Sequence, residues 1–347
     1  MKQKKIFKNF RSYRYYKVLK LSFFILILIL YSILLIVCFS ESEEEKYDSP
    51  IFDGTYACHD SISCGIKYGK SACNISTDSQ FKEVFMSALY TENYFKGSLL
   101  LGYTIKKYHP NHAMYLLYFP SQISASLVCQ LKAVGWIMKE VERIPVPWDG
   151  HLYGNFDDQF TKLQMWSLIE FDSIIYIDSD AIVLQRIDNL FKMITPYAKF
   201  EFAAAPDVLD WQILTKFNAG FIILKPDINV YKEMMRVHKV RDSFDLEFAE
   251  QSFLNEFYKF RHIQLPLTYN FNLALMEFYP HLWPILFPDI KVIHFTVQKP
   301  FLTAIPHEMF KEPFEIWDSM YSEMDKVMDL TKTRIKCENI FSPSDFL

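Results

Sequence analysis

Acidic residues are missing from the first 20 positions, and residues 21–39 carry no charge of either sign. The first 20 positions hold eight Lys or Arg, so a basic flank precedes an uncharged run of 19 residues, which is long enough to cross a bilayer as a helix. A cleaved signal peptide is the alternative, but its apolar region is usually about 7–15 residues, and no clear small-x-small cleavage site follows. The pattern favours an uncleaved signal anchor with residues 1–20 in the cytosol and the bulk of the chain translocated.

Basic residues are scarce in the rest of the chain. After residue 20 there remain 29 Lys and Arg against 41 Asp and Glu, which is a net charge of −12. Nucleic-acid binding depends on clustered cations that neutralise phosphates. This composition therefore argues against a nucleic-acid partner.

Closely spaced cysteine pairs are also lacking, because no C-x2-C motif occurs among the five cysteines that follow the apolar run. Three of the five crowd residues 58–73, and Cys129 and Cys337 stand alone. A metal knot is one interpretation of the crowded group, but an oxidising compartment favours disulfides. Five translocated thiols leave one that is unpaired or joined to another chain.

The chain divides by composition into segments. Residues 40–80 are acidic and poor in apolar runs, which is typical of a stem between a membrane and a catalytic body. Residues 81–330 alternate short apolar runs with amphipathic segments, which predicts one α/β domain with a mostly parallel central sheet. Residues 331–347 are expected to form a C-terminal tail.

The periodicity predicts an order of elements in the α/β domain. Strands are expected at 84–89, 113–118, 137–144, 173–177, 217–224 and 290–294, and helices at 94–108, 124–134, 160–171, 230–240, 247–258 and 314–329, with a helical turn at 188–193.

Two carboxylates, Asp178 and Asp180, stand directly after the apolar run Ser173–Ile177. Ligands of open α/β sheets bind at the carboxyl ends of the strands, where two such side chains can hold a divalent cation. The alternative is that both residues cap the next turn through Asx hydrogen bonds. A metal-dependent phosphoesterase would need a second cluster of ligands, which the sequence does not offer.

Five patterns surround this acidic pair in a specific order. They are Phe160 to Leu168 (FTKLQMWSL), Phe217 to Pro226 (FNAGFIILKP), Glu250 to Asn255 (EQSFLN), Leu265 to Asn270 (LPLTYN) and His294 to Phe301 (HFTVQKPF). From about Ala88 to Phe301 the chain resembles glycosyltransferase family 8, the glycogenin-like retaining sugar-nucleotide transferases. The resemblance implies a single Rossmann-like nucleotide-diphospho-sugar transferase domain of the GT-A type, preceded by the transmembrane helix.

The resemblance also implies a metal site. Asp178, Asp180 and His294 match the ligands of a family Mn²⁺ (or Mg²⁺) ion held against a nucleoside diphosphate. A cation stabilises the negative charge that develops on a sugar-diphosphate leaving group. A buried core histidine is the alternative for His294 when it is considered alone.

Further residues match donor-binding positions of the family. Lys162 and Lys299 match lysines that reach the sugar and the diphosphate, although solvated surface lysines are the alternative. The uracil and ribose positions fall at Leu89, Tyr90 and Tyr94, where Tyr94 could instead pack on a helix face. The remaining nucleotide-binding and sugar-binding positions are Ser179, Asn218 and Ala219.

Gln251 falls where the family places a residue beneath the anomeric carbon, and Glu250 stands where Asp is usual. Because no residue is an evident nucleophile for double displacement, Gln251 is expected to stabilise charge. Val297 in place of a glycine and Phe301 in place of a tryptophan are two further departures. Val297 would be strained at positive φ.

Together these features predict a metal-dependent retaining glycosyltransferase. It would move a hexose or N-acetylhexosamine from a UDP-sugar donor to a glycan or glycoprotein acceptor, as a single-pass type II protein of the Golgi membrane. A catalytically weakened relative that binds or scaffolds glycans is the alternative.

Overall fold

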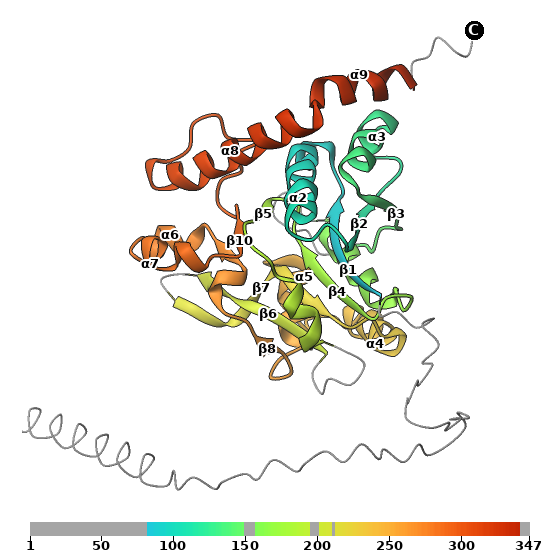
Figure 1. Cartoon of the computed structure of the whole chain (residues 1–347). Coiled ribbons are helices and arrows are strands. Elements are labelled where there is room, and N and C mark those ends of the chain that lie inside the picture. Colours follow the sequence, from blue (N-terminus) through green and yellow to red (C-terminus); the bar gives the residue numbers. More distant parts are fainter. Residues whose placement is uncertain (1–81, 149–156, 195–200, 210–211, 341–347) are drawn as a thin grey trace, which may run out of the picture. The chain divides into compact units, whose positions relative to one another are not determined.

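The computed structural model describes residues 82–148, 157–194, 201–209 and 212–340 (Figure 1). The predicted cytosolic segment (residues 1–20), membrane segment and stem lie outside the described residues. No described helix has the length and apolarity that crossing a bilayer requires.

The central sheet has seven strands in the order β3-β2-β1-β4-β7-β6-β8. Its first four strands in this order are β3 (Ile137–Glu140), β2 (Ala113–Tyr118), β1 (Glu83–Leu89) and β4 (Ser173–Ile177), and neighbouring members of this group are parallel. They are followed by β7 (Gln212–Leu224), which is antiparallel to both of its neighbours, then β6 (Phe202–Leu209) and β8 (Ile263–Gln264). The prediction of an α/β domain with a mostly parallel sheet is confirmed.

Apolar side chains of the central strands alternate between two cores, one on each face of the sheet. In β4, Ile175 and Ile177 belong to one core, whereas Ile174 and Tyr176 belong to the other. The first core packs against α2 (Phe95–Tyr108) and α3 (Ala125–Val134), and the second against α5 (Ala249–Phe257) and α4 (Ile228–His238). Burial on both faces explains why β4 is an uninterrupted apolar run in the sequence.

A second sheet of three strands lies at the end of β4, in the order β5-β10-β9. It consists of β5 (Ala181–Val183), β10 (Val292–His294) and β9 (Phe271–Asn272), and β10 pairs His294 with Ala181 across an antiparallel ladder. The turn between β4 and β5 holds Asp178, Ser179 and Asp180, so the acidic pair bridges the two sheets. This pairing brings a histidine more than 110 positions away to the acidic pair.

Short elements complete the body. The 3-10 segments are η1 (Glu92–Tyr94), η2 (Gln159–Ser167), η3 (Asp188–Met193), η4 (Leu267–Tyr269), η5 (Phe287–Asp289) and η6 (Glu308–Phe310), and the short helices are α6 (Ala274–Phe278) and α7 (Leu282–Leu286). The predicted α-helix at 160–171 is thus a 3-10 segment, and β6 was not predicted.

Two C-terminal helices, α8 (Lys311–Met328) and α9 (Leu330–Ile340), run beside α2 and α3 (Figure 1). Most of the predicted C-terminal tail is therefore the helix α9, up to residue 340. A disulfide between Cys129 of α3 and Cys337 of α9 joins positions 208 residues apart. The pairing of these two cysteines was left open by their spacing in the sequence.

Candidate active site

A cavity of about 650 Å³ opens at the carboxyl ends of β1 and β4. This size is typical of a small-molecule site. The sequence-predicted residues that line it are Tyr90, Tyr94, Asp178, Ser179, Asp180, Asn218, Ala219, Glu250, Gln251, His294 and Lys299. Of the predicted site residues, the side chains of Leu89 and Lys162 are instead buried and do not line the cavity.

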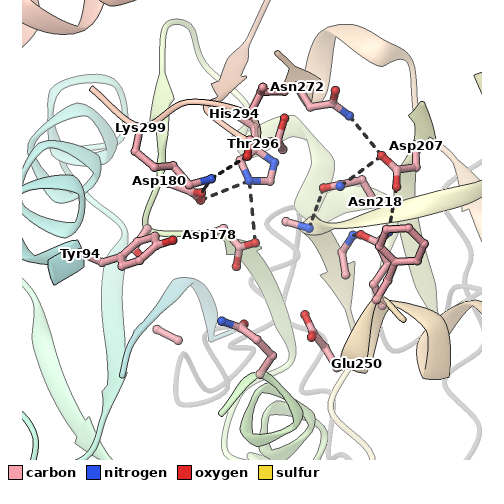
Figure 2. Close-up of a pocket in the computed structure, with 18 of the residues that line it drawn as sticks. Tyr94, Asp178, Asp180, Asp207, Asn218, Glu250, Asn272, His294, Thr296 and Lys299 are labelled. Carbon is pink, nitrogen blue, oxygen red and sulfur yellow. Dashed lines mark hydrogen bonds and ion pairs between the residues drawn. The ribbon is translucent and has the colours of Figure 1, made fainter. Parts of the chain in front are cut away.

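Asp178, Asp180 and His294 converge on one point (Figure 2). Nε2 of His294 lies 3.2 Å from Oδ1 of Asp180 and 3.9 Å from Oδ2 of Asp178. One ligand atom from each residue lies within 4.8 Å of the others, so the three can hold one metal ion. Two carboxylates and one imidazole form a donor set that suits a divalent cation such as Mn²⁺.

The hydrogen bonds around His294 fix which nitrogen faces the aspartates. The backbone N–H of Gly220 donates to Oδ1 of Asn218 at 3.0 Å, and Nδ2 of Asn270 donates to the same oxygen at 3.0 Å. Oδ1 of Asn270 therefore faces Nδ1 of His294 at 3.1 Å, so we assign the proton to Nδ1. In the neutral ring this leaves the Nε2 lone pair toward the aspartates, which is the tautomer that a metal ligand needs.

Gly220 makes the close approach of these groups possible. A Cβ at this position would collide with Cε1 of His294 and lie 2.9 Å from Oδ2 of Asp178. The backbone oxygen of Gly220 also accepts a hydrogen bond of 2.8 Å from the N–H of Asp178. The glycine of the Asn-Ala-Gly pattern therefore leaves the room that the donor set occupies.

The two oxygens of Asp178 have different partners. Oδ1 accepts a hydrogen bond of 2.6 Å from the hydroxyl of Tyr176 and lies 3.0 Å from Nζ of Lys162. Oδ2 is the oxygen that faces His294. The carboxylate is thus held with one oxygen directed to the proposed metal position.

Lys162 is a buried counterion. Its Nζ lies 2.6 Å from Oε1 of Glu250 and 4.8 Å from the centroid of the Tyr176 ring. Burial lowers the pKa of Lys162, but Asp178 and Glu250 outweigh it and raise that pKa. Burial raises the pKa of Glu250, and the nearby Lys162 opposes this shift.

Lys299 balances the other aspartate. Its Nζ lies 2.6 Å from Oδ2 of Asp180 and also donates to the backbone oxygens of Phe295 and Thr296. Burial would raise the pKa of Asp180, but the Lys299 ammonium, and the His294 ring when it is protonated, hold it well below its usual range. Asp180 therefore stays ionised at neutral pH, as a metal ligand must.

Gln251 is oriented at both ends of its amide. Oε1 accepts from the N–H of Ala219 at 2.9 Å, and Nε2 donates to Oδ2 of Asp207 at 2.8 Å. Oδ1 of Asp207 also accepts from the amides of Asn218 and Asn272, each at 3.3 Å (Figure 2). Asp207, Asn218, Gln251 and Asn272 all line the cavity and form a polar wall there.

Five contributors to the site received no role from the sequence: Tyr176, Asp207, Gly220, Asn270 and Asn272. Asn270 ends the LPLTYN pattern and could have been found there. Asp207 lies in β6, whose run of alanines and a proline gives no strand periodicity. No sequence signal pointed to Asp207 or Asn272.

Comparison with solved structures identifies the class of fold. GlyE of Streptococcus pneumoniae TIGR4, a glycosyltransferase, matches with a TM-score of 0.52 and 18% identity, covering 71% of this chain and 64% of that chain. The galactosyltransferase LgtC, solved with donor and acceptor sugar analogues, matches with a TM-score of 0.51 and 17% identity, covering 70% of this chain and 95% of its own. These likenesses show the GT-A type of glycosyltransferase fold.

Sequence comparison finds curated relatives among the glycogenins and galactinol synthases. Glycogenin of Neurospora crassa is 27% identical over 271 residues, which are 74% of this chain and 38% of the relative. Galactinol synthase 6 of Arabidopsis thaliana is 28% identical over 193 residues, which are 48% of this chain and 56% of the relative. Glycogenin-1 of Oryctolagus cuniculus is 28% identical over 228 residues, which are 62% of this chain and 64% of the relative.

The chain spans less than two thirds of the length of these three relatives. No protein family model matches it. The relatives support a glycogenin-like family and agree with the sequence prediction of a sugar-nucleotide-dependent glycosyltransferase.

Proposed function

We propose that this protein is a divalent-metal-dependent, retaining glycosyltransferase. It transfers a hexose or N-acetylhexosamine from a UDP-sugar to a hydroxyl of a glycan or glycoprotein in the secretory pathway. The convergence of Asp178, Asp180 and His294 at the wall of the cavity carries the proposal.

The donor set fits Mn²⁺ (or Mg²⁺), since Asp180 is ionised and the lone pair of His294 Nε2 faces both carboxylates. Asp178, Asp180 and His294 would hold this ion, which would neutralise the charge on a departing nucleoside diphosphate. Tyr90 and Tyr94 line the same cavity and supply aromatic surface where the family resemblance places the uridine. Lys299 is an ammonium within reach of the same region.

Gln251 is assigned to stabilise charge at the reacting carbon. Its amide is fixed by Ala219 and Asp207, so the side chain enters the cavity in one orientation. Fixed dipoles stabilise developing charge without reorganising during the reaction. Glu250, held by Lys162, lines the cavity beside it.

We further propose a type II membrane topology with the catalytic domain in the Golgi lumen. The Cys129–Cys337 disulfide supports an oxidising compartment, because such bonds are rare in the cytosol. Mobility of the chain on denaturing gels with and without reductant, after isolation from cells with thiols blocked, tests this. A free Cys129 thiol in that material would contradict the luminal assignment.

Two departures from the family motivate the weakened alternative, and the structure bears on both. Val297 is absent from the described non-glycine residues with positive φ, so its β-branched side chain causes no such strain. Phe301 lies 5.4 Å from Tyr94 and 6.3 Å from Trp317 between ring centroids, so it packs as an aromatic where the family has tryptophan. These observations favour the active enzyme.

The direct test is hydrolysis or transfer by the full-length chain with Mn²⁺ across UDP-glucose, UDP-galactose, UDP-N-acetylglucosamine and UDP-glucuronate. Asp180→Asn should lower kcat/KM at least about 100-fold, because it replaces a charged metal ligand with a neutral amide of nearly the same size. Glu233→Gln, on the exposed face of α4, is the control for a lost carboxylate. Unchanged turnover in Asp180→Asn would refute the assigned role.

Calorimetry with UDP and Mn²⁺ separates the enzyme from the glycan-binding scaffold. The enzyme should bind UDP more tightly with Mn²⁺ than without it, and Asp180→Asn should abolish the difference. Absence of UDP binding in the folded wild-type chain would favour the scaffold.

A further inference from the structure

Large apolar side chains are exposed at the cavity. Phe248, Val297 and Leu302 keep 41%, 44% and 55% of their surface exposed, and all three line the cavity. We call these three residues the apolar rim. Single exposed apolar side chains are common on protein surfaces, but these three all line one cavity, where a bound ligand can cover them.

The backbone holds Phe248 at the cavity. Its carbonyl accepts hydrogen bonds from the N–H groups of Gln251 and Ser252, and its own N–H donates to Oγ of Ser252 at 3.3 Å. The next residue, Ala249, has a φ of 48°, which is costly for a residue other than glycine. Phe248 is therefore fixed in position while its ring stays exposed.

Val297 and Leu302 belong to a segment that is anchored at its other residues. The ring of Phe301 packs toward Trp317 of α8, and the N–H groups of Leu302 and Thr303 donate to the carbonyl of Lys299. These contacts fix the segment on the side of α8, while Val297 and Leu302 line the cavity.

The inner wall of the cavity is chemically different. Among the described residues that line the cavity as a whole, one lysine, Lys299, stands against six carboxylates, namely Asp158, Asp178, Asp180, Asp207, Glu247 and Glu250. Glu247 is exposed and adjoins Phe248 of the rim. This excess of negative charge would repel an anionic acceptor but not an uncharged one.

We propose that the acceptor is an uncharged hydroxyl compound that carries an apolar group beside the accepting hydroxyl, and that this group covers the apolar rim. This inference rests on the proposed function and specifies its acceptor. The donor's sugar is polar and suits the hydrogen-bonding inner wall, and its diphosphate would be held by the proposed metal ion and Lys299. The apolar rim is left for the acceptor.

The test compares methyl, hexyl and phenyl glycosides of the same neutral sugars as acceptors for the full-length chain, with a UDP-sugar and Mn²⁺. The hexyl or phenyl glycoside should have a KM about tenfold below that of the methyl glycoside, since apolar contacts of this size are worth about that factor. The hexyl and phenyl arms distinguish an alkyl from an aromatic group. Phenyl glucuronide should be a poorer acceptor than phenyl glucoside.

Phe248→Ser should remove most of the preference for the apolar glycosides. Phe260→Ser is the matched control, because Phe260 is a 91% exposed phenylalanine that does not line the cavity, and its replacement should keep the preference. Equal KM values for methyl, hexyl and phenyl glycosides in a chain that hydrolyses its donor would overturn the inference and leave the proposed function standing.

A chain that binds UDP and Mn²⁺ without turnover would instead contradict the proposed function. Calorimetric binding of the hexyl, phenyl and methyl glycosides to that UDP complex then decides the inference by itself. Tighter binding of the hexyl or phenyl glycoside than of the methyl glycoside supports the proposal that an apolar group covers the apolar rim, and equal binding refutes it.

Discussion

Oδ1 of Asn270 lies 3.1 Å from Nδ1 of His294, on the side of the imidazole ring away from the two aspartates. The bond holds the ring so that Nε2 faces Asp178 and Asp180. Loss of a group that hydrogen-bonds to a metal-ligating histidine typically lowers metal affinity by about 10–100-fold. Asn270 is therefore a positioning residue for the proposed metal ligand.

Asn270→Ala should weaken Mn²⁺ binding at least about tenfold, because the His294 ring loses the acceptor that sets its tautomer. Titration calorimetry of the metal alone measures this without turnover. Asn255→Ala is the control, since Asn255 is another buried amide, bonded to the backbone of Phe217. The control should lower stability and keep the metal affinity. Equal affinities for wild type and Asn270→Ala would remove the role assigned to this bond.

Tyr176→Phe should also weaken Mn²⁺ binding about tenfold, since Asp178 loses the hydroxyl that holds its Oδ1 and gains freedom to turn Oδ2 away. Tyr258→Phe deletes a comparable buried hydroxyl, which accepts a hydrogen bond from Trp166, and should leave metal binding unchanged. A Tyr176→Phe protein with wild-type affinity would show that Lys162 alone orients the carboxylate.

The sequence contained most of the metal site but little of its surroundings. Asp178 and Asp180 follow a buried apolar run, which is a local pattern, and the resemblance supplied His294. Asn270 and Tyr176 act through contacts made only after β10 and β9 pair and β4 is buried on both faces. Such contacts depend on tertiary structure, so periodicity and spacing do not reveal them.

The missed elements have a similar cause. β6 reads as a run of alanines with a proline, and its pairing with β7 has register shifts around Pro206, so no alternation marks it. With β6 unrecognised, Asp207 could not be placed at the cavity. The Cys129–Cys337 bond likewise depends on how α9 packs against α3.

Gly220→Ala should abolish Mn²⁺ binding in a chain that still folds, because the added methyl group would occupy the space of the His294 ring and crowd Asp178. Differential scanning fluorimetry with and without Mn²⁺ measures both properties. Gly102→Ala crowds Trp136 in a core away from the cavity, so it should lower Tm while the rise of Tm with Mn²⁺ persists. A preserved Mn²⁺ shift in Gly220→Ala would contradict the required close approach.

His109 should make stability depend on pH. The residue is 1% exposed, and its Nε2 accepts a hydrogen bond of 2.9 Å from the N–H of Ile187. Burial lowers the pKa of His109 to about 4, although Asp188 opposes the shift and His112 and Arg186 add to it. The folded chain thus keeps this ring neutral at pH values where the unfolded chain, with a histidine pKa of about 6.5, binds a proton.

The unfolded state therefore binds more protons than the folded state between pH 6.5 and 4. The neutral His109 ring thus contributes fully to the free energy of unfolding above pH 6.5, and this contribution is lost as pH falls through 4. The loss amounts to at most about 3 kcal/mol. His109→Gln keeps an acceptor for Ile187 and removes the titration, so its urea unfolding free energy should fall less steeply over this range than that of the wild type. Parallel curves for the two proteins would show that His109 does not stay neutral on folding.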